Sequence, residues 1–183
     1  DEIARFINAL NELAESTRLG IPVIMASNSR NEKGDEVFGM NDAVGVFTTF
    51  PGTLGLAAAA QGAKKRGEDD LEVFRRFAEI CRREWLATGL RKGYMYMLDV
   101  VTDPRWQRIY GTFGEDTDLI TRLAPVLIAG FQGEVLDDES VALTVKHFLF
   151  FFGFVYVLDL HYAEGQYNVY VTPGSLEQYH LPP

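Results

Sequence analysis

Apolar side chains recur every three or four positions in three parts of the chain, with polar residues between them. This spacing predicts an amphipathic helix in each part. The predicted helices cover residues 2–18, 71–88 and 119–131. Gly20 and Gly89 follow the first two helices and are expected to end them. Acidic residues just before the third, including Glu115 and Asp116, favour a helix start.

Three continuous apolar runs lie between or after these helices. They cover residues 21–26, 94–101 and 141–148. Because their side chains do not alternate in polarity, we expect strands buried on both faces, as in a parallel sheet. Alternating helices and strands indicate crossover connections and an α/β fold. Further apolar runs at 149–158 and 167–171 predict an irregular or β-hairpin C-terminal segment. No internal repeat or linker interrupts the 183 residues, which favours a single domain over 1–183.

Composition narrows the possible functions. The chain has 26 acidic and 17 basic residues, a net charge of -9 that disfavours binding to nucleic acid or to an anionic membrane surface. One cysteine, Cys81, excludes an internal disulfide and a cysteine-based zinc site. No glycine-rich motif for binding a nucleotide or a phosphate is found. His161 and Glu164 are the nearest approach to a pair of metal ligands, but their spacing is better explained by chance. We therefore expect no cofactor and no metal, and the compartment stays open.

Five sequence segments occur together in an informative order. They are LGIPVIMASNSRN (19–31), TTFPGTLGLAAA (48–59), LDVVTDPRWQRIYGTFGED (98–116), VKHF (145–148) and DLHYAEGQYNVYVTPGSLEQYHLPP (159–183). In this combination they resemble the amino-terminal barrel domain of glycoside hydrolase family 3, the β-glucosidases and exo-acting glucan hydrolases. The resemblance implies an incomplete (β/α)8-type barrel with about three parallel strands and flanking helices. It also implies a sugar site at the carboxyl ends of those strands.

The resemblance assigns roles to four residues. Lys146 and His147 correspond to a basic pair that hydrogen-bonds sugar hydroxyls, and Arg108 corresponds to a sugar-binding arginine. Asn28 stands where the family has an aspartate that holds sugar hydroxyls. Without the motif, a Lys-His pair at a strand end is a solvated terminus, and Arg108 could pair with a neighbour such as Glu115.

Other features depart from the family pattern. After VKHF the family has a turn rich in proline and glycine, whereas this chain continues with Leu149, Phe150, Phe151 and Phe152. These rings are expected to fill the sugar pocket, because each buried aromatic occupies about 150–250 Å². Retaining hydrolysis needs two carboxyl groups about 5–5.5 Å apart. The resemblance places both after Pro183, so we expect no catalytic residue here, no activity of the chain alone, and weak or lost β-glucoside binding.

Three hypotheses remain open about what the chain is. An open sheet has edges and an apolar face that proteins cover, so we expect a homo-oligomer or a missing barrel segment. The first hypothesis is an inactive family 3 segment, remodelled by engineering or drift to stand alone. The second is an enzyme subunit whose partner chain supplies the missing strands and carboxylates. The third is a non-catalytic scaffold that oligomerises or binds a small apolar ligand.

Overall fold

The computed structural model describes most of the chain and shows three parallel strands with flanking helices. The described residues are 2–28, 31–32, 47–102, 104, 106, 108–147 and 173–183. The elements are α1 (Glu2–Glu15), β1 (Ala26–Ser27), α2 (Thr53–Lys65), α3 (Glu72–Thr88), β2 (Lys92–Gly93), η1 (Ile109–Gly111), α4 (Thr117–Gln132), β3 (Ala142–Leu143) and η2 (Leu176–His180). The α/β class and the three predicted helices are confirmed.

The strands form one sheet in the order β1-β2-β3, with both pairs parallel. Ser27 lies opposite Gly93, which in turn lies opposite Leu143. An isolated bridge between Met97 and Lys146 continues the β2–β3 pairing beyond the ladder. The carboxyl ends of all three strands therefore meet at one edge of the sheet, where α/β folds place their sites.

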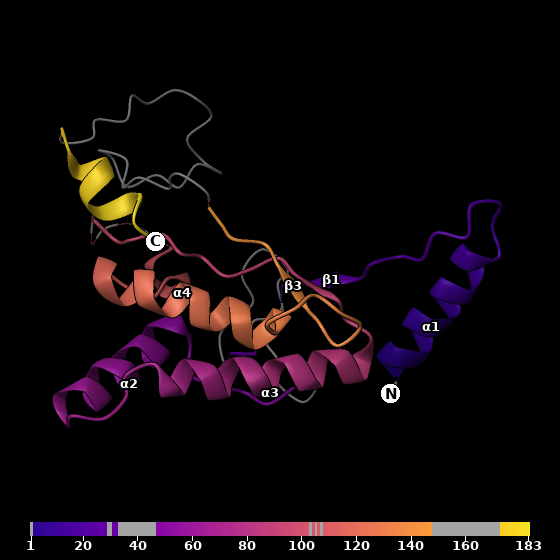
Figure 1. Ribbon diagram of the computed structural model, residues 1–183, viewed down its shortest axis with the longest axis horizontal. Coiled ribbons are helices and arrows are strands. Elements are labelled where there is room, and N and C mark those ends of the chain that lie inside the picture. Colours follow the sequence, from indigo (N-terminus) through magenta and orange to yellow (C-terminus); the bar gives the residue numbers. More distant parts are fainter. Residues whose placement is uncertain are drawn as a thin grey trace.

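Helices α2, α3 and α4 lie together beside the sheet (Figure 1). Their apolar faces surround a core rich in aromatic rings that meet mainly edge to face. These rings belong to Phe74, Phe77, Trp85, Tyr96, Phe113 and Phe131. Helices α3 and α4 approach closely at Gly130, where an added Cβ would lie 2.4 Å from the Cβ of Ala78. This close packing depends on the small size of both residues.

The acidic start predicted for the third helix is confirmed, because Asp116 caps α4. Its side chain accepts a hydrogen bond from the Leu119 backbone N–H at 3.0 Å. The same carboxylate accepts one from Gln61 of α2 at 2.7 Å, which ties the two helices together. Helix α2 itself was not predicted. The signal for it is Pro51-Gly52 ahead of an alanine-rich run, a composition with high helix propensity.

The prediction of a doubly buried strand over residues 21–26 is wrong. Only Ala26 and Ser27 pair in the sheet, and the side chains of Ile21 and Ile24 are 65% and 66% exposed. The reason is the position of α1, which projects away from the other helices (Figure 1). It contacts α3 with Ile7 packed against Gly89, and within the described residues Met25 packs against the main core while Ile21 and Ile24 stay exposed.

The other two predicted strands are displaced from the observed ladder. Strand β2 precedes the predicted run at 94–101, and β3 occupies only the second and third residues of the run at 141–148. The predicted C-terminal segment, Phe150, Phe151 and Phe152 included, lies outside the described residues. Of the helices that the structure describes, none is long and apolar enough to cross a membrane.

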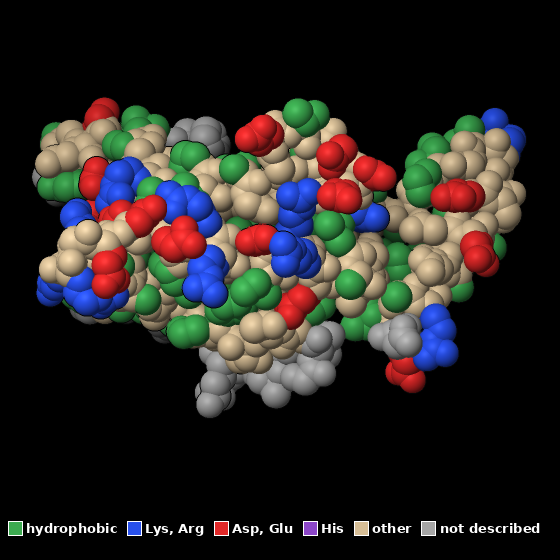
Figure 2. Space-filling view, turned by 60° about the horizontal axis from the view of Figure 1, so that its bottom comes forward, with side chains coloured by type: hydrophobic (Ala, Val, Ile, Leu, Met, Phe, Trp, Pro, Cys, Tyr) green, Lys and Arg blue, Asp and Glu red, His purple; other side chains and the backbone are tan. Residues whose placement is uncertain are grey.

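Charged side chains of both signs are interspersed over the face shown in Figure 2. Several belong to exposed ion pairs of α3 and the turn before it, such as Arg75 with Asp69 and Glu72. Pairs this exposed contribute about 0–1 kcal/mol each to stability. They keep this face soluble and carry no chemistry of their own.

Candidate functional site

Three charged side chains are buried in the described part of the chain, and all three belong to residues linked to Met97 by sheet pairing, by a hydrogen bond or by sequence. They are Asp99, Arg108 and Lys146, with 7%, 6% and 6% of their surface exposed. Lys146 forms the bridge with Met97, Asp99 follows Met97 by two residues, and the Arg108 guanidinium donates to the Met97 sulfur at 3.5 Å. Burying charge is costly unless it is paired, so such a cluster at strand ends indicates a functional site.

Asp99 joins the two predicted strand ends by holding His147. One of its carboxylate oxygens lies 3.0 Å from His147 Nδ1 and accepts the His147 backbone N–H at 3.3 Å. The Asp99 side chain is almost fully buried, whereas the imidazole keeps about a fifth of its surface exposed. The contact through Nδ1 fixes the orientation of the imidazole ring.

Lys146 is not the solvated terminus that its strand-end position alone suggests. Its ammonium group lies 4.4 Å from the centre of the Tyr94 ring, a cation–π contact, and Tyr94 keeps more than half of its surface exposed. No motif in the sequence singles out Tyr94.

Arg108 is likewise buried, whereas Glu115 is exposed. Arg108 directly precedes η1, and η1 is fixed to α2 by the hydrogen bond from Thr53 Oγ1 to the Tyr110 carbonyl at 3.1 Å. Trp106, two residues earlier, packs with Met97 in a small separate core. Trp106 therefore packs beside Met97, the residue whose sulfur Arg108 contacts.

Asn28, the fourth predicted residue, follows β1 directly. It lies at the same sheet edge as the other three because β1 runs parallel to β2, and its side-chain oxygen is buried. Asn31, which belongs to the same motif, is fully buried and hydrogen-bonds α3. The predicted pocket-filling residues Phe150, Phe151 and Phe152 lie outside the described residues, as does the pair His161 and Glu164.

His180 belongs to no motif in the sequence, but in the structure it lies within electrostatic reach of Asp99. It ends η2, which Thr117 of α4 contacts through the Tyr179 carbonyl at 3.3 Å. Burial lowers the pKa of His180 below its ordinary value near 6.5, while the negative charge of Asp99 opposes that change. No pattern around residue 180 could have revealed this proximity.

The lowered pKa of His180 predicts a pH effect on stability. Because the unfolded chain binds the proton more tightly, stability is greatest above pH 6.5 and falls as the pH drops through that value. We expect the fall in unfolding temperature between about pH 7.5 and 5.5 to be smaller in His180→Gln. Glu177→Gln, on the same turn, is the control and should keep the wild-type fall. Equal pH dependence of all three proteins would contradict the assignment.

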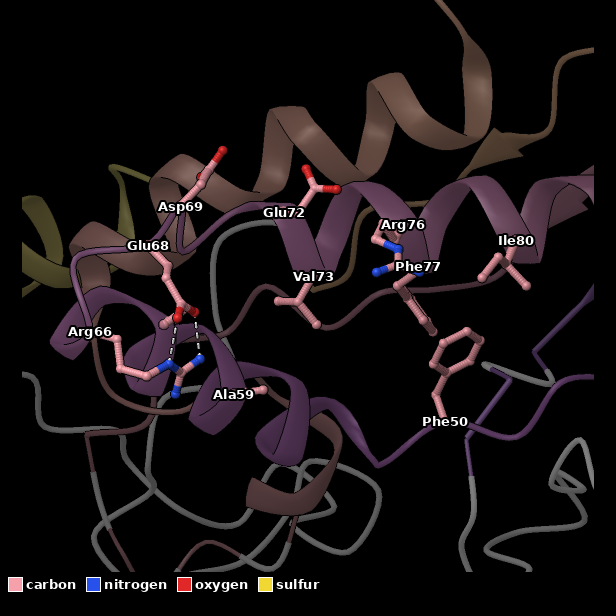
Figure 3. A pocket seen from close by; sticks show the side chains of 11 residues that line it. Phe50, Ala59, Arg66, Glu68, Asp69, Glu72, Val73, Arg76, Phe77 and Ile80 are labelled. Atoms are coloured by element: carbon pink, nitrogen blue, oxygen red, sulfur yellow. Dashed lines mark hydrogen bonds and ion pairs between the residues drawn. The ribbon is translucent and has the colours of Figure 1, made fainter.

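A hollow of about 470 Å³, distinct from the strand-end cluster, lies between α2 and α3 (Figure 3). Its described lining is apolar at Phe50, Val73 and Phe77, with charged side chains around it such as the paired Arg66 and Glu68. These rim pairs are exposed, and none of the buried charged residues lines the hollow. Among the described residues, no group of three or more acidic, histidine or cysteine side chains could hold a metal ion. We therefore place the candidate site at the strand ends.

Comparison with known proteins identifies the fold and the family. The Glycosyl hydrolase family 3 N terminal domain matches residues 1–155. The chain belongs to glycosyl hydrolase family 3. The resemblance carried by the DPRWQR and VKHF motifs is thereby confirmed, and the residues of the buried cluster fall inside the matched range.

Relatives in this family match the chain along its whole length. It is 37% identical to the beta-glucosidase C of Emericella nidulans and 36% identical to a periplasmic beta-glucosidase/beta-xylosidase of Dickeya chrysanthemi. All of this chain is covered in both comparisons, but only 28% and 26% of the relatives. The chain thus spans little more than a quarter of the length of these family 3 proteins.

Solved structures of the family share the fold. A beta-glucosidase from Listeria innocua superposes with a TM-score of 0.74 and 27% identity, over 98% of this chain and 22% of that one. An exo-1,3/1,4-beta-glucanase from a Pseudoalteromonas species superposes with a TM-score of 0.76 at 24% identity, over 99% of this chain and 21% of that one. The three parallel strands with flanking helices therefore correspond to part of the family 3 N-terminal barrel.

Proposed function

We propose that the chain supplies part of the sugar-binding site of a family 3 β-glycoside hydrolase. In this proposal Lys146, His147, Arg108 and Asn28 hydrogen-bond the hydroxyls of the terminal sugar. The supporting observation is the cluster of buried charged side chains at the carboxyl ends of the strands. Hydrogen bonds from charged donors are stronger than those between neutral groups, so a neutral sugar gains affinity from buried cations.

The proposed substrate is a terminal β-glucosyl residue. The relatives named above carry the activities beta-glucosidase and beta-glucosidase/beta-xylosidase in their names. Asp99 orients His147 and is a positioning group in this scheme, not a nucleophile. The carboxyl pair that retaining hydrolysis requires, about 5–5.5 Å apart, comes from other parts of the complete protein. The isolated chain is therefore inactive in this proposal.

Exposed apolar side chains on α1 and just after it indicate a surface that another part of the protein covers. Phe6 and Leu13 of α1 and Leu19, Ile21 and Ile24 beyond it are all more than 60% exposed. Figure 2 shows the lobe formed by this part projecting from the body with apolar side chains on its surface. Since proteins cover apolar patches of this kind, we propose that further barrel segments of the same polypeptide cover this one. A second copy of the chain is the alternative cover.

One experiment tests both proposals. Two samples are purified: the 183-residue chain, and the longer polypeptide of which we propose it is a part, here called the complete polypeptide. Both are assayed with a chromogenic β-glucoside, and the molar mass of each is measured by light scattering. We expect turnover by the complete polypeptide alone, and self-association or apolar-dye binding by the isolated chain. Turnover by a monomeric isolated chain would overturn the proposed division of the site. Absence of turnover by the complete polypeptide, with binding of apolar probes but not of glucose, would favour the scaffold alternative.

A further inference from the structure

A network of hydrogen bonds fastens the segment after β1 to helix α3. Asn31 is fully buried and has a φ of +51°, an unusual conformation for a residue other than glycine. Its side-chain oxygen accepts from Trp85 Nε1 at 2.8 Å, and its side-chain nitrogen donates to Glu84 Oε2 at 2.7 Å. Both polar atoms of this one side chain thus bind adjacent residues of α3.

Glu84 also binds the far end of the same segment. Its carboxylate accepts from the Thr48 backbone N–H at 3.0 Å and from the Thr48 hydroxyl. The two ends contact each other as well, because the Phe50 N–H donates to the Asn31 carbonyl at 2.8 Å. Glu84 is therefore the common acceptor that joins residue 31, residue 48 and helix α3. We call these three residues, Asn31, Thr48 and Glu84, the α3 clamp.

The α3 clamp lies close in sequence to Asn28. One residue before Asn28, the Ser27 carbonyl accepts the Tyr94 N–H at 2.8 Å and fixes the end of β1 in the sheet. Three residues after Asn28, Asn31 is fixed to α3. Asn28 is thus held from both sides, by the sheet and by the clamp. Asn28 and Asn31 are only three positions apart, so a shift of Asn31 reaches Asn28 over a short length of chain.

We propose that Glu84 is a positioning residue for the sugar site, acting through Asn31 to hold Asn28 in place. This inference rests on the proposed function, because it assigns the clamp to the site that contains Asn28, Arg108, Lys146 and His147. Glu84 itself contacts no sugar in this scheme. Its carboxylate accepts the three donors offered by Asn31 and Thr48, and a neutral amide in its place offers only one oxygen to them.

The test is a double-mutant cycle on the complete polypeptide, read as glucose affinity by calorimetry at about 25 °C. Glu84→Gln is expected to weaken glucose binding about tenfold, the loss typical of a broken hydrogen-bond network. In a protein that already carries Asn28→Ala, the same change should have less than about a twofold effect, because the residue being positioned is gone. A role in stability alone would move the unfolding temperature and leave both affinities unchanged.

Two further variants keep the test decisive. Glu79→Gln removes an exposed α3 carboxylate that pairs only with Arg83 in the described structure, and should leave the affinity unchanged. Thr48→Val removes one hydroxyl donor with little change of shape, and should weaken binding in the same direction if Glu84→Gln fails to fold. Equal glucose affinity in wild type, Glu84→Gln and Thr48→Val, with loss in Asn28→Ala, would overturn the clamp. Unchanged affinity in Asn28→Ala, Arg108→Met and Lys146→Met would overturn the proposed sugar site itself.

Discussion

Replacing Gly130 by alanine is expected to lower the free energy of unfolding by roughly 1–3 kcal/mol. The new Cβ would lie 2.4 Å from the Cβ of Ala78, far inside van der Waals contact, so α3 and α4 must move apart. This cost outweighs the helix propensity of alanine over glycine, about 1 kcal/mol. Phe131, the next residue, packs on Trp85, so the shift also reaches the α3 clamp. Urea unfolding followed by tryptophan fluorescence measures the change.

The matched control is the same substitution in a helix with room for it. At Gly62 of α2 the nearest atom to an added Cβ is Nη1 of the flexible Arg66 side chain, at 3.4 Å. Gly62→Ala should therefore stabilise the protein by about 0.5–1 kcal/mol, through helix propensity alone. If the two alanine variants change stability in the same direction, the close α3–α4 contact is not what holds Gly130.

Replacing Lys146 by methionine is expected to weaken glucose binding by the complete polypeptide roughly 10- to 100-fold. Methionine keeps the apolar stem but removes the charged donor next to His147 and its contact with the Tyr94 ring. The effect is large because hydrogen bonds from charged groups contribute about 1.5–3 kcal/mol, more than neutral ones. Calorimetric titration with glucose measures it, and circular dichroism at the same temperature shows whether the variant is folded.

Lys92→Met is the control for this substitution. Lys92 belongs to β2 of the same sheet, but its side chain is exposed and it pairs with Ala26 and Ala142 through the backbone. Its removal should change glucose affinity less than about twofold. Wild-type affinity in folded Lys146→Met would remove Lys146 from the proposed site.

Helix periodicity was the most reliable information in the sequence. The helix predicted over 71–88 differs from α3 by one residue, because a wide apolar stripe and the left-handed Gly89 fix both its face and its end. Helix α2 was missed since its alanines make no such stripe. The bounds of the strands were predicted poorly for another reason. An apolar run indicates that its side chains are buried, but it does not show which of its residues form backbone hydrogen bonds with a neighbouring strand. Ile21 and Ile24 show the difference, being apolar and yet exposed here.

The site was predicted by motif, and the structure adds the contacts that a motif does not contain. VKHF and DPRWQR indicated Lys146, His147 and Arg108 as sugar-binding residues, and that role stays a prediction; in the structure Lys146 pairs with Met97 in the sheet and Arg108 donates to the Met97 sulfur. Nothing in the sequence pattern connects Asp99 to His147, or Asn31 to Glu84, because these partners are 48 and 53 residues apart. Such pairs depend on how the chain folds back on itself, which local spacing does not encode.

The burial of Lys146 and Arg108 has a consequence for how a ligand is received. Most of the hydration shell of each cation is removed when the chain folds, before any sugar arrives. In the proposed site, an incoming polyol would therefore meet preorganised donors with little solvent left to rearrange, because the free energy of dehydrating them is part of folding and not of association.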